Sequence, residues 1–88
     1  MRIKYLKQFR KDILKLNKKQ LAQFKKRIAL FQLDLNHSYL DNHPLKGSLK
    51  GLYSINVTGD IRAIYRPKKL KSGLVCEFIR LGTHSELY

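Results

Sequence analysis

Hydrophobic residues recur at two different periods along the chain. From Leu6 to Leu35 they fall three or four residues apart, which is the spacing of amphipathic helices. This pattern predicts one helix that ends near Asn17 and a second that follows after a few residues, so the two should form an antiparallel hairpin. The apolar stripes are Leu6, Phe9, Ile13 and Leu16, and then Leu21, Phe24, Ile28, Phe31 and Leu35.

Strand-like alternation flanks this helical part. Ile3 and Tyr5 alternate with charged residues, which suits a short first strand. Residues 36–51 are rich in Asn, Asp, Ser, Gly and Pro and are predicted to form a loop. Three more strands should follow: one around Tyr53, Ile55 and Val57, one over Ile61–Arg66 after a turn at Thr58–Asp60, and one over Leu74–Leu81 after a basic loop at 67–73.

The predicted order β-α-α-β-β-β defines the fold class. Strands that follow a helical hairpin favour an α+β domain, with the hairpin packed on one face of a mainly antiparallel, four-stranded sheet. A chain of 88 residues suffices for a single domain, which we expect to span residues 1–88.

The charge is strongly unbalanced and points to the kind of partner. Nineteen Lys and Arg stand against six Asp and Glu, a formal net charge of +13. Such an excess favours a polyanionic partner: RNA, DNA, an anionic membrane or an acidic protein. A membrane surface is the least favoured, because both apolar stripes are needed for the core. No signal-peptide or membrane-spanning pattern occurs, so we expect a soluble, cytoplasmic protein in which Cys76 is a small buried hydrophobe.

Candidate catalytic groups lie where the predicted strands end. In a three-strand meander, the end of the last strand returns beside the start of the strand before it. His84 should therefore lie near Asp60 and Arg62, and the same holds for Tyr88. Asn56 should lie across the hairpin from Arg62. No His or Cys pair has metal-ligand spacing and no Gly-rich phosphate loop occurs, so we expect neither a metal nor a small-molecule cofactor.

These side chains suit the cleavage of RNA by its own 2′-hydroxyl. That reaction needs a base for the hydroxyl, an acid for the leaving 5′-oxygen and a cation for the charge that develops on phosphorus. Histidine is the best acid or base near neutral pH, arginine clamps phosphate through two donors, and an aromatic ring stacks on an unpaired base. The polar candidates are His43, Lys46, Lys50, Asn56, Asp60, Arg62, His84 and Tyr88.

Three segments together resemble the RelE/ParE superfamily of toxin-antitoxin toxins, and most of all its YafQ-type branch. They are "KQFRKDILKL", "HPLKGSLKGLYSINVTGDIRAIYR" and "FIRLGTHSELY", which cover much of the chain. Toxins of this branch are ribosome-dependent endoribonucleases held inactive by a cognate antitoxin. The resemblance implies that mRNA on the ribosome and an acidic antitoxin protein are the partners of this chain.

The resemblance also implies roles for matching positions. Arg62 resembles an arginine that holds the phosphate in RelE-like relatives. His43, Asp60, His84 and Tyr88 would share proton transfer and the orientation of the scissile nucleotide, and further RNA contacts are expected from Lys46, Lys50, Asn56 and Arg66.

One departure keeps two alternatives open. Asn56 stands where YafQ-like toxins usually carry a histidine, and asparagine cannot exchange a proton near pH 7. A non-catalytic, basic nucleic-acid-binding module therefore remains an alternative. A ParE-like inhibitor of DNA gyrase is another, although the tail that carries His84 argues against it.

Overall fold

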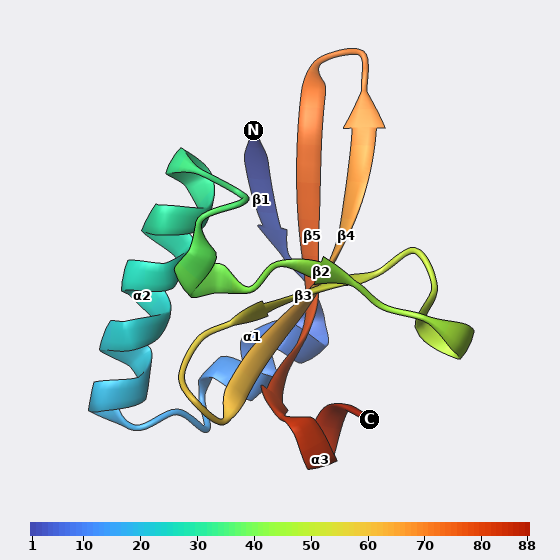
Figure 1. Cartoon of the computed structure of the whole chain (residues 1–88). Coiled ribbons are helices and arrows are strands. Elements are labelled where there is room, and N and C mark those ends of the chain that lie inside the picture. Colours follow the sequence, from blue (N-terminus) through green and yellow to red (C-terminus); the bar gives the residue numbers. More distant parts are fainter.

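A twisted sheet, covered on one face by two helices, forms the molecule in this computed structural model, which describes all residues from 1 to 88 (Figure 1). The strands are β1 (Arg2–Tyr5), β2 (His43–Pro44), β3 (Tyr53–Asn56), β4 (Ile61–Leu70) and β5 (Gly73–Thr83). The helices are α1 (Lys7–Ile13), α2 (Lys18–Leu33) and α3 (His84–Leu87), with short 3₁₀ helices η1 (Ser38–Leu40) and η2 (Gly47–Leu49).

The strand order is β1-β5-β4-β3-β2, and only the β1–β5 pair is parallel. The predicted α+β class and the mainly antiparallel sheet are therefore confirmed, but the prediction of four strands was one short. The fifth strand, β2, lies inside the predicted loop and pairs His43 with Ser54. Its second residue is Pro44, which disfavours helical backbone at His43 and is tolerated at the edge of a sheet.

Two predicted boundaries were wrong. The first helix ends at Ile13, and Asn17 instead caps α2: its side chain accepts from Gln20 N at 2.8 Å, while Gln20 Oε1 accepts from Asn17 N at 3.0 Å. The predicted loop at 67–73 is mostly strand, because β4 and β5 stay paired as far as Leu70 and Gly73. Beyond Tyr65, β5 is the only neighbour of β4, so Pro67 is tolerated there without an N–H.

Aromatic side chains fix both helices to the same face of the sheet. Phe9 of α1 and Phe31 of α2 each lie 5.4 Å, between ring centroids, from Phe78 of β5. Phe9 also contacts Phe24 of α2 at 5.8 Å. These rings are buried, as is Cys76, whose thiol pKa is raised by burial. The predicted hydrophobic stripes therefore form the core, and none of the helices has the length and apolar character needed to cross a membrane.

The carboxylate of Asp12 ties α1 to the end of β5. Its Oδ2 accepts from the main-chain N–H of Leu81 at 2.9 Å and from Arg80 Nε at 3.0 Å, and its Oδ1 accepts from Gln8 at 3.0 Å. Burial alone would raise the pKa of Asp12, but these donors outweigh it and hold the pKa below its usual value. The link anchors the end of β5 from which α3 begins, opposite the projecting β4–β5 hairpin (Figure 1).

Candidate active site

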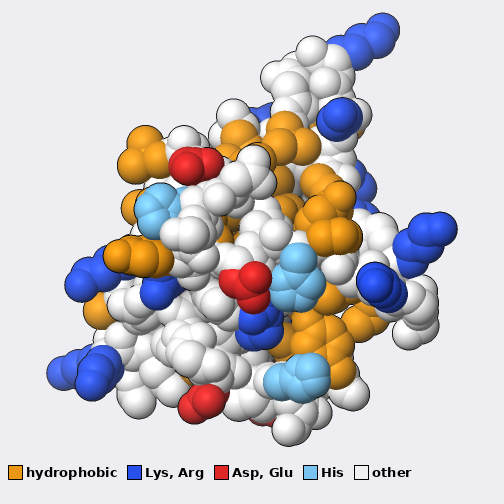
Figure 2. All heavy atoms as spheres, in the orientation of Figure 1, with side chains coloured by type: hydrophobic (Ala, Val, Ile, Leu, Met, Phe, Trp, Pro, Cys, Tyr) orange, Lys and Arg blue, Asp and Glu red, His pale blue; other side chains and the backbone are white.

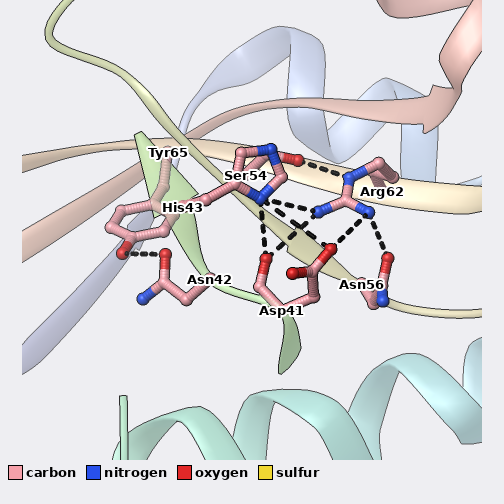
Figure 3. A network of polar contacts seen from close by, with 7 residues as sticks. All are labelled: Asp41, Asn42, His43, Ser54, Asn56, Arg62 and Tyr65. Atoms are coloured by element: carbon pink, nitrogen blue, oxygen red, sulfur yellow. Dashed lines mark hydrogen bonds and ion pairs between the residues drawn. The ribbon is translucent and has the colours of Figure 1, made fainter. Parts of the chain in front are cut away.

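Arg62 lies at the centre of a polar network on the face of the sheet opposite α1 and α2. The β3–β4 register places it opposite Asn56, as predicted. Its Nε donates to Ser54 Oγ at 2.7 Å, one terminal nitrogen donates to Asn56 Oδ1, and the other donates to the main-chain oxygen of Asp41 at 3.3 Å (Figure 3). Only 17% of its side chain is exposed, so the guanidinium is fixed in place with one side open.

His43 joins this network from β2. Its Nδ1 lies 2.8 Å from the main-chain oxygen of Asp41. Because a carbonyl can only accept, this shorter contact assigns the proton of the neutral ring to Nδ1, and Nε2 is left as an acceptor. Arg62 NH2, which lies 3.4 Å from the same Nδ1, then donates to the Asp41 carbonyl and not to the ring. Burial raises the pKa of Tyr65 to about 12, so its hydroxyl stays protonated and donates to Asn42 Oδ1 at 2.9 Å. That bond anchors the residue before His43 to β4.

The C-terminal segment folds into the single helical turn α3. Thr83 caps it: its hydroxyl accepts from Glu86 N at 3.3 Å, and Glu86 Oε1 accepts from Thr83 N at 2.8 Å. Hydrogen bonds from Thr83 to the Glu86 carboxylate, first of all the one from the Thr83 main-chain N–H, lower the pKa of the Glu86 carboxyl. A Cβ at Gly82 would lie 3.1 Å from Glu86 Oε1, so glycine at this position allows the Glu86 side chain to lie close to the main chain. The turn brings the rings of His84 and Tyr88 into contact, 4.6 Å apart between centroids and tilted by 47°.

These elements surround one open cleft of about 380 Å³. Leu45 and Leu49 give it an apolar wall, and Figure 2 shows histidine, basic and acidic side chains beside hydrophobic ones in the lower half of this face. Five of the predicted site residues line the cleft: His43, Lys46, Arg62, His84 and Tyr88. The loop, the central hairpin and the tail thus meet at one place, although they are far apart in sequence.

The other predicted residues lie at different distances from this cleft. Asn56 contacts Arg62, and Asp60 lines an adjoining hollow together with Arg62 and His84. Lys50 ends the 3₁₀ helix η2 and is not among the residues that line the cleft. Arg66 is also not among them, because its guanidinium donates twice to Glu77, at 3.2 Å, on the neighbouring strand.

Sequence reasoning missed two members of the network. Asp41 precedes the His-Pro motif, and nothing local indicates that its main chain reaches Arg62, 21 residues away. Ser54 alternates with Tyr53 and Ile55, which predicts an outward-facing strand residue, yet it is completely buried. The alternation of β3 does place its hydroxyl on the same face as Asn56, and that is the one signal that could have identified it.

The cleft brings together the groups that phosphodiester cleavage requires. It offers a free imidazole nitrogen on His43, a second imidazole on His84, and a fixed guanidinium on Arg62. The ring of Tyr88 adds an aromatic surface beside them. No three His, Cys, Asp or Glu side chains come together in an arrangement that would hold a metal ion.

Known proteins provide an independent comparison. The family model described as "Bacterial toxin of type II toxin-antitoxin system, YafQ" matches residues 1–88. The chain belongs to the YafQ toxin family. The resemblance inferred from the sequence is therefore confirmed, and the protein is a toxin of a type II toxin-antitoxin system. No curated protein matches the chain.

Solved structures agree with membership of the YafQ family. The chain is similar to YafQ from E. coli strain BL21(DE3), with 28% identity, a TM-score of 0.77, and coverage of 100% of this chain and 99% of that one. It is also similar to a chain of the E. coli DinJ-YafQ toxin-antitoxin complex, with 30% identity, a TM-score of 0.71, and coverage of 98% and 94%. The YoeB/ParE toxin from Agrobacterium tumefaciens shares the fold at 20% identity, with a TM-score of 0.77 and coverage of 96% and 99%.

Proposed function

We propose that this YafQ-family toxin is a ribosome-dependent endoribonuclease that cleaves mRNA and so inhibits translation. The observation that carries the proposal is the convergence of two histidines, an immobilised arginine and an aromatic ring on one cleft. The cleft is open, as a site for an RNA strand must be. Lys46 on its edge adds a cation for the RNA backbone.

The proposed reaction is attack of a ribose 2′-hydroxyl on the adjacent phosphorus. His43 Nε2 accepts the hydroxyl proton while the new P–O2′ bond forms. The P–O5′ bond breaks, and His84 in its protonated form donates a proton to the leaving 5′-oxygen. The products are a 2′,3′-cyclic phosphate and a 5′-hydroxyl, so all atoms and charges balance.

Arg62 and Tyr88 support this reaction without exchanging protons. The guanidinium faces the non-bridging oxygens, where negative charge increases in the transition state. Because its other donors are already bound to the protein, it needs little reorganisation. Tyr88 stacks on an unpaired base and orients the scissile phosphate. Asp60, in the adjoining hollow beside His84, is placed to orient that histidine or the neighbouring nucleotide.

Asn56 replaces the histidine expected at this position, and its contacts suggest what it does instead. It accepts a hydrogen bond from Arg62 and so helps to fix the guanidinium. In this assignment the two proton-transfer roles belong to His43 and His84, and the site does not depend on a titratable group at position 56.

We also propose an acidic antitoxin as the partner that silences the toxin. YafQ of E. coli occurs in a toxin-antitoxin complex with DinJ. The net charge of +13 favours a partner of opposite charge, which would bind basic helices or cover the cleft. The free toxin would act in the cytoplasm, where ribosomes and mRNA are found.

A reconstituted translation reaction tests the enzymatic proposal. Purified toxin is added to ribosomes that carry an end-labelled mRNA, and in parallel to the naked mRNA. We expect cleavage on the ribosome, products that end in 2′,3′-cyclic phosphate and 5′-hydroxyl, and no cleavage by the His84→Ala variant. Intact mRNA together with inhibition of purified DNA gyrase would replace this proposal with the ParE-like alternative.

A further inference from the structure

Asp41 has the most unusual backbone in the chain. It is the only non-glycine residue with a positive φ, 45°, and its ψ is 47°, which is the left-handed region. L-residues rarely adopt this conformation, although aspartate and asparagine tolerate it better than most. It turns the main chain so that the carbonyl of Asp41 points at the site, 2.8 Å from His43 Nδ1 and 3.3 Å from an Arg62 nitrogen (Figure 3).

The side chain of the same residue also faces the site. Its Oδ2 lies 3.6 Å from Arg62 NH1 and 3.9 Å from His43 Nδ1. The carboxylate is 62% exposed, whereas the Arg62 side chain is 17% exposed. An exposed anion therefore lies against the open side of a mostly buried cation.

The N–H donors of Arg62 show which part of the guanidinium the Asp41 carboxylate faces. A guanidinium has five N–H donors. Three of them go to Ser54 Oγ, Asn56 Oδ1 and the main-chain oxygen of Asp41. The two that remain are on the terminal nitrogens, whose N–H groups are donors with which arginine binds phosphate, and one of these nitrogens also lies 3.4 Å from His43 Nδ1. The Asp41 carboxylate lies beside one of these nitrogens.

We propose that Asp41 is a positioning residue. In the free protein its carboxylate pairs with the guanidinium of Arg62 in the place of the RNA phosphodiester, and the phosphodiester displaces the carboxylate when RNA binds. The assignment of the incoming anion to RNA rests on the proposed function. The proposed competition between the Asp41 carboxylate and a phosphate for Arg62 does not rest on that function, because any phosphate would compete for the same donors.

An alternative role for Asp41 is purely structural, as the residue that ends η1. The substitution Asp41→Asn separates the two roles. Asparagine tolerates the left-handed backbone, keeps the main-chain carbonyl and has nearly the same shape, and it removes only the negative charge. A purely structural residue would leave anion binding unchanged or weaken it. A residue that competes with phosphate should give tighter binding when its charge is removed.

The test measures binding of inorganic phosphate by following the Arg62 side-chain N–H signal in NMR spectra, which is assigned by its loss in Arg62→Lys. For Asp41→Asn we expect the dissociation constant to fall roughly two- to fivefold, as for loss of an exposed ion pair. Asp41→Gly should behave in the same way, because glycine adopts a positive φ without strain. Asp34→Asn is the matched control: it removes the same charge from a carboxylate that accepts from Asn36 N, and binding should stay as in the wild type.

Unchanged or weaker phosphate binding by both Asp41 variants would overturn the inference, and so would equal tightening by Asp34→Asn. A second titration uses an RNA made non-cleavable by a 2′-deoxy nucleotide and tests the proposed function separately. Tighter phosphate binding without tighter RNA binding would support competition for Arg62 and contradict RNA as its natural anion.

Discussion

Replacing Arg62 with lysine would show how far the site depends on the planar fork of arginine. Lysine keeps the positive charge but is a single centre with a compact ammonium group. In the structure the fork reaches Ser54 Oγ at 2.7 Å on one side and the main-chain oxygen of Asp41 at 3.3 Å on the other, with Asn56 between. One ammonium cannot satisfy acceptors that are spread around a guanidinium.

Ser54 determines how much the Arg62→Lys substitution should lower the free energy of unfolding. Ser54 is completely buried beside Arg62, and the aliphatic stem of a lysine would still cover it, so its hydroxyl would lose the Arg62 Nε donor without gaining full access to water. An unsatisfied buried polar group costs about 1–3 kcal/mol. In a domain of this size each kcal/mol lowers Tm by about 4–8 °C, so we expect Arg62→Lys to melt roughly 5–20 °C below the wild type.

The cost in activity should be larger. A donor aimed at the charge of the transition state contributes on the order of 100- to 1,000-fold to the rate. Single-turnover cleavage of mRNA on ribosomes, at a temperature where calorimetry shows both proteins folded, measures this loss. Adding Ser54→Ala to Arg62→Lys should restore part of the stability, because it removes the unpaired hydroxyl, and should restore none of the activity.

An Arg62→Lys variant that melts and cleaves like the wild type would refute the role given to the guanidinium of Arg62. That role would also fail if Ser54→Ala changed the free energy of unfolding equally in both backgrounds. That additivity would mean that the Arg62–Ser54 hydrogen bond contributes nothing measurable.

Three further predictions concern the tail and the anchor of β5. His84→Ala should lose about 100- to 10,000-fold in cleavage rate while Tm, measured by calorimetry, stays within a few degrees, since the ring is exposed and its aromatic contact is with Tyr88. A folded and fully active variant would remove His84 from the mechanism. Tyr88→Ala should weaken binding of a non-cleavable RNA by about 1–3 kcal/mol, and Tyr88→Phe should weaken it much less, since the ring stacks on a base. If both variants weakened RNA binding equally, the hydroxyl and not the ring would carry the role. Asp12→Asn should flatten the dependence of unfolding free energy on pH. Because the folded pKa of Asp12 is lowered, the wild type keeps this stability above the ordinary aspartate pKa of about 3.9 and loses it as the pH falls through the folded value; acid unfolding at the same pH in both proteins would contradict this.

The hydrophobic pattern predicted the parts of the fold that depend on periodicity. Phe9, Phe24 and Phe31 follow helical spacing and are all buried, because a stripe on a short helix has only the sheet to pack against. Hairpin geometry likewise predicted that Asn56 would face Arg62. The approach of His84 to Arg62 follows from the antiparallel pairing of the last two strands, which brings both residues to the same end of the sheet.

The parts that periodicity could not predict depend on single contacts between distant residues. The burial of Ser54 results from Arg62 lying over an outward-facing strand position, and alternation alone predicts exposure there. The pairing of Arg66 with Glu77 depends on a register shift between Ile64 and Tyr65 that no sequence pattern marks. If the two strands paired without the extra β5 residue of the bulge, Ile79, Phe78 would lie opposite Arg66 in place of Glu77.

Cleavage of mRNA on the ribosome by this cleft is tested most directly by mapping mRNA 5′ ends in cells after induction of the toxin. Induction is carried out with and without the adjacent gene as the antitoxin candidate, and with His84→Ala as the inactive control. We expect new 5′ ends within translated reading frames for the wild type alone, their loss with His84→Ala or the antitoxin, and normal DNA supercoiling. Whole mRNA in growth-arrested cells, or the same cleavage pattern with His84→Ala, would contradict cleavage by this cleft.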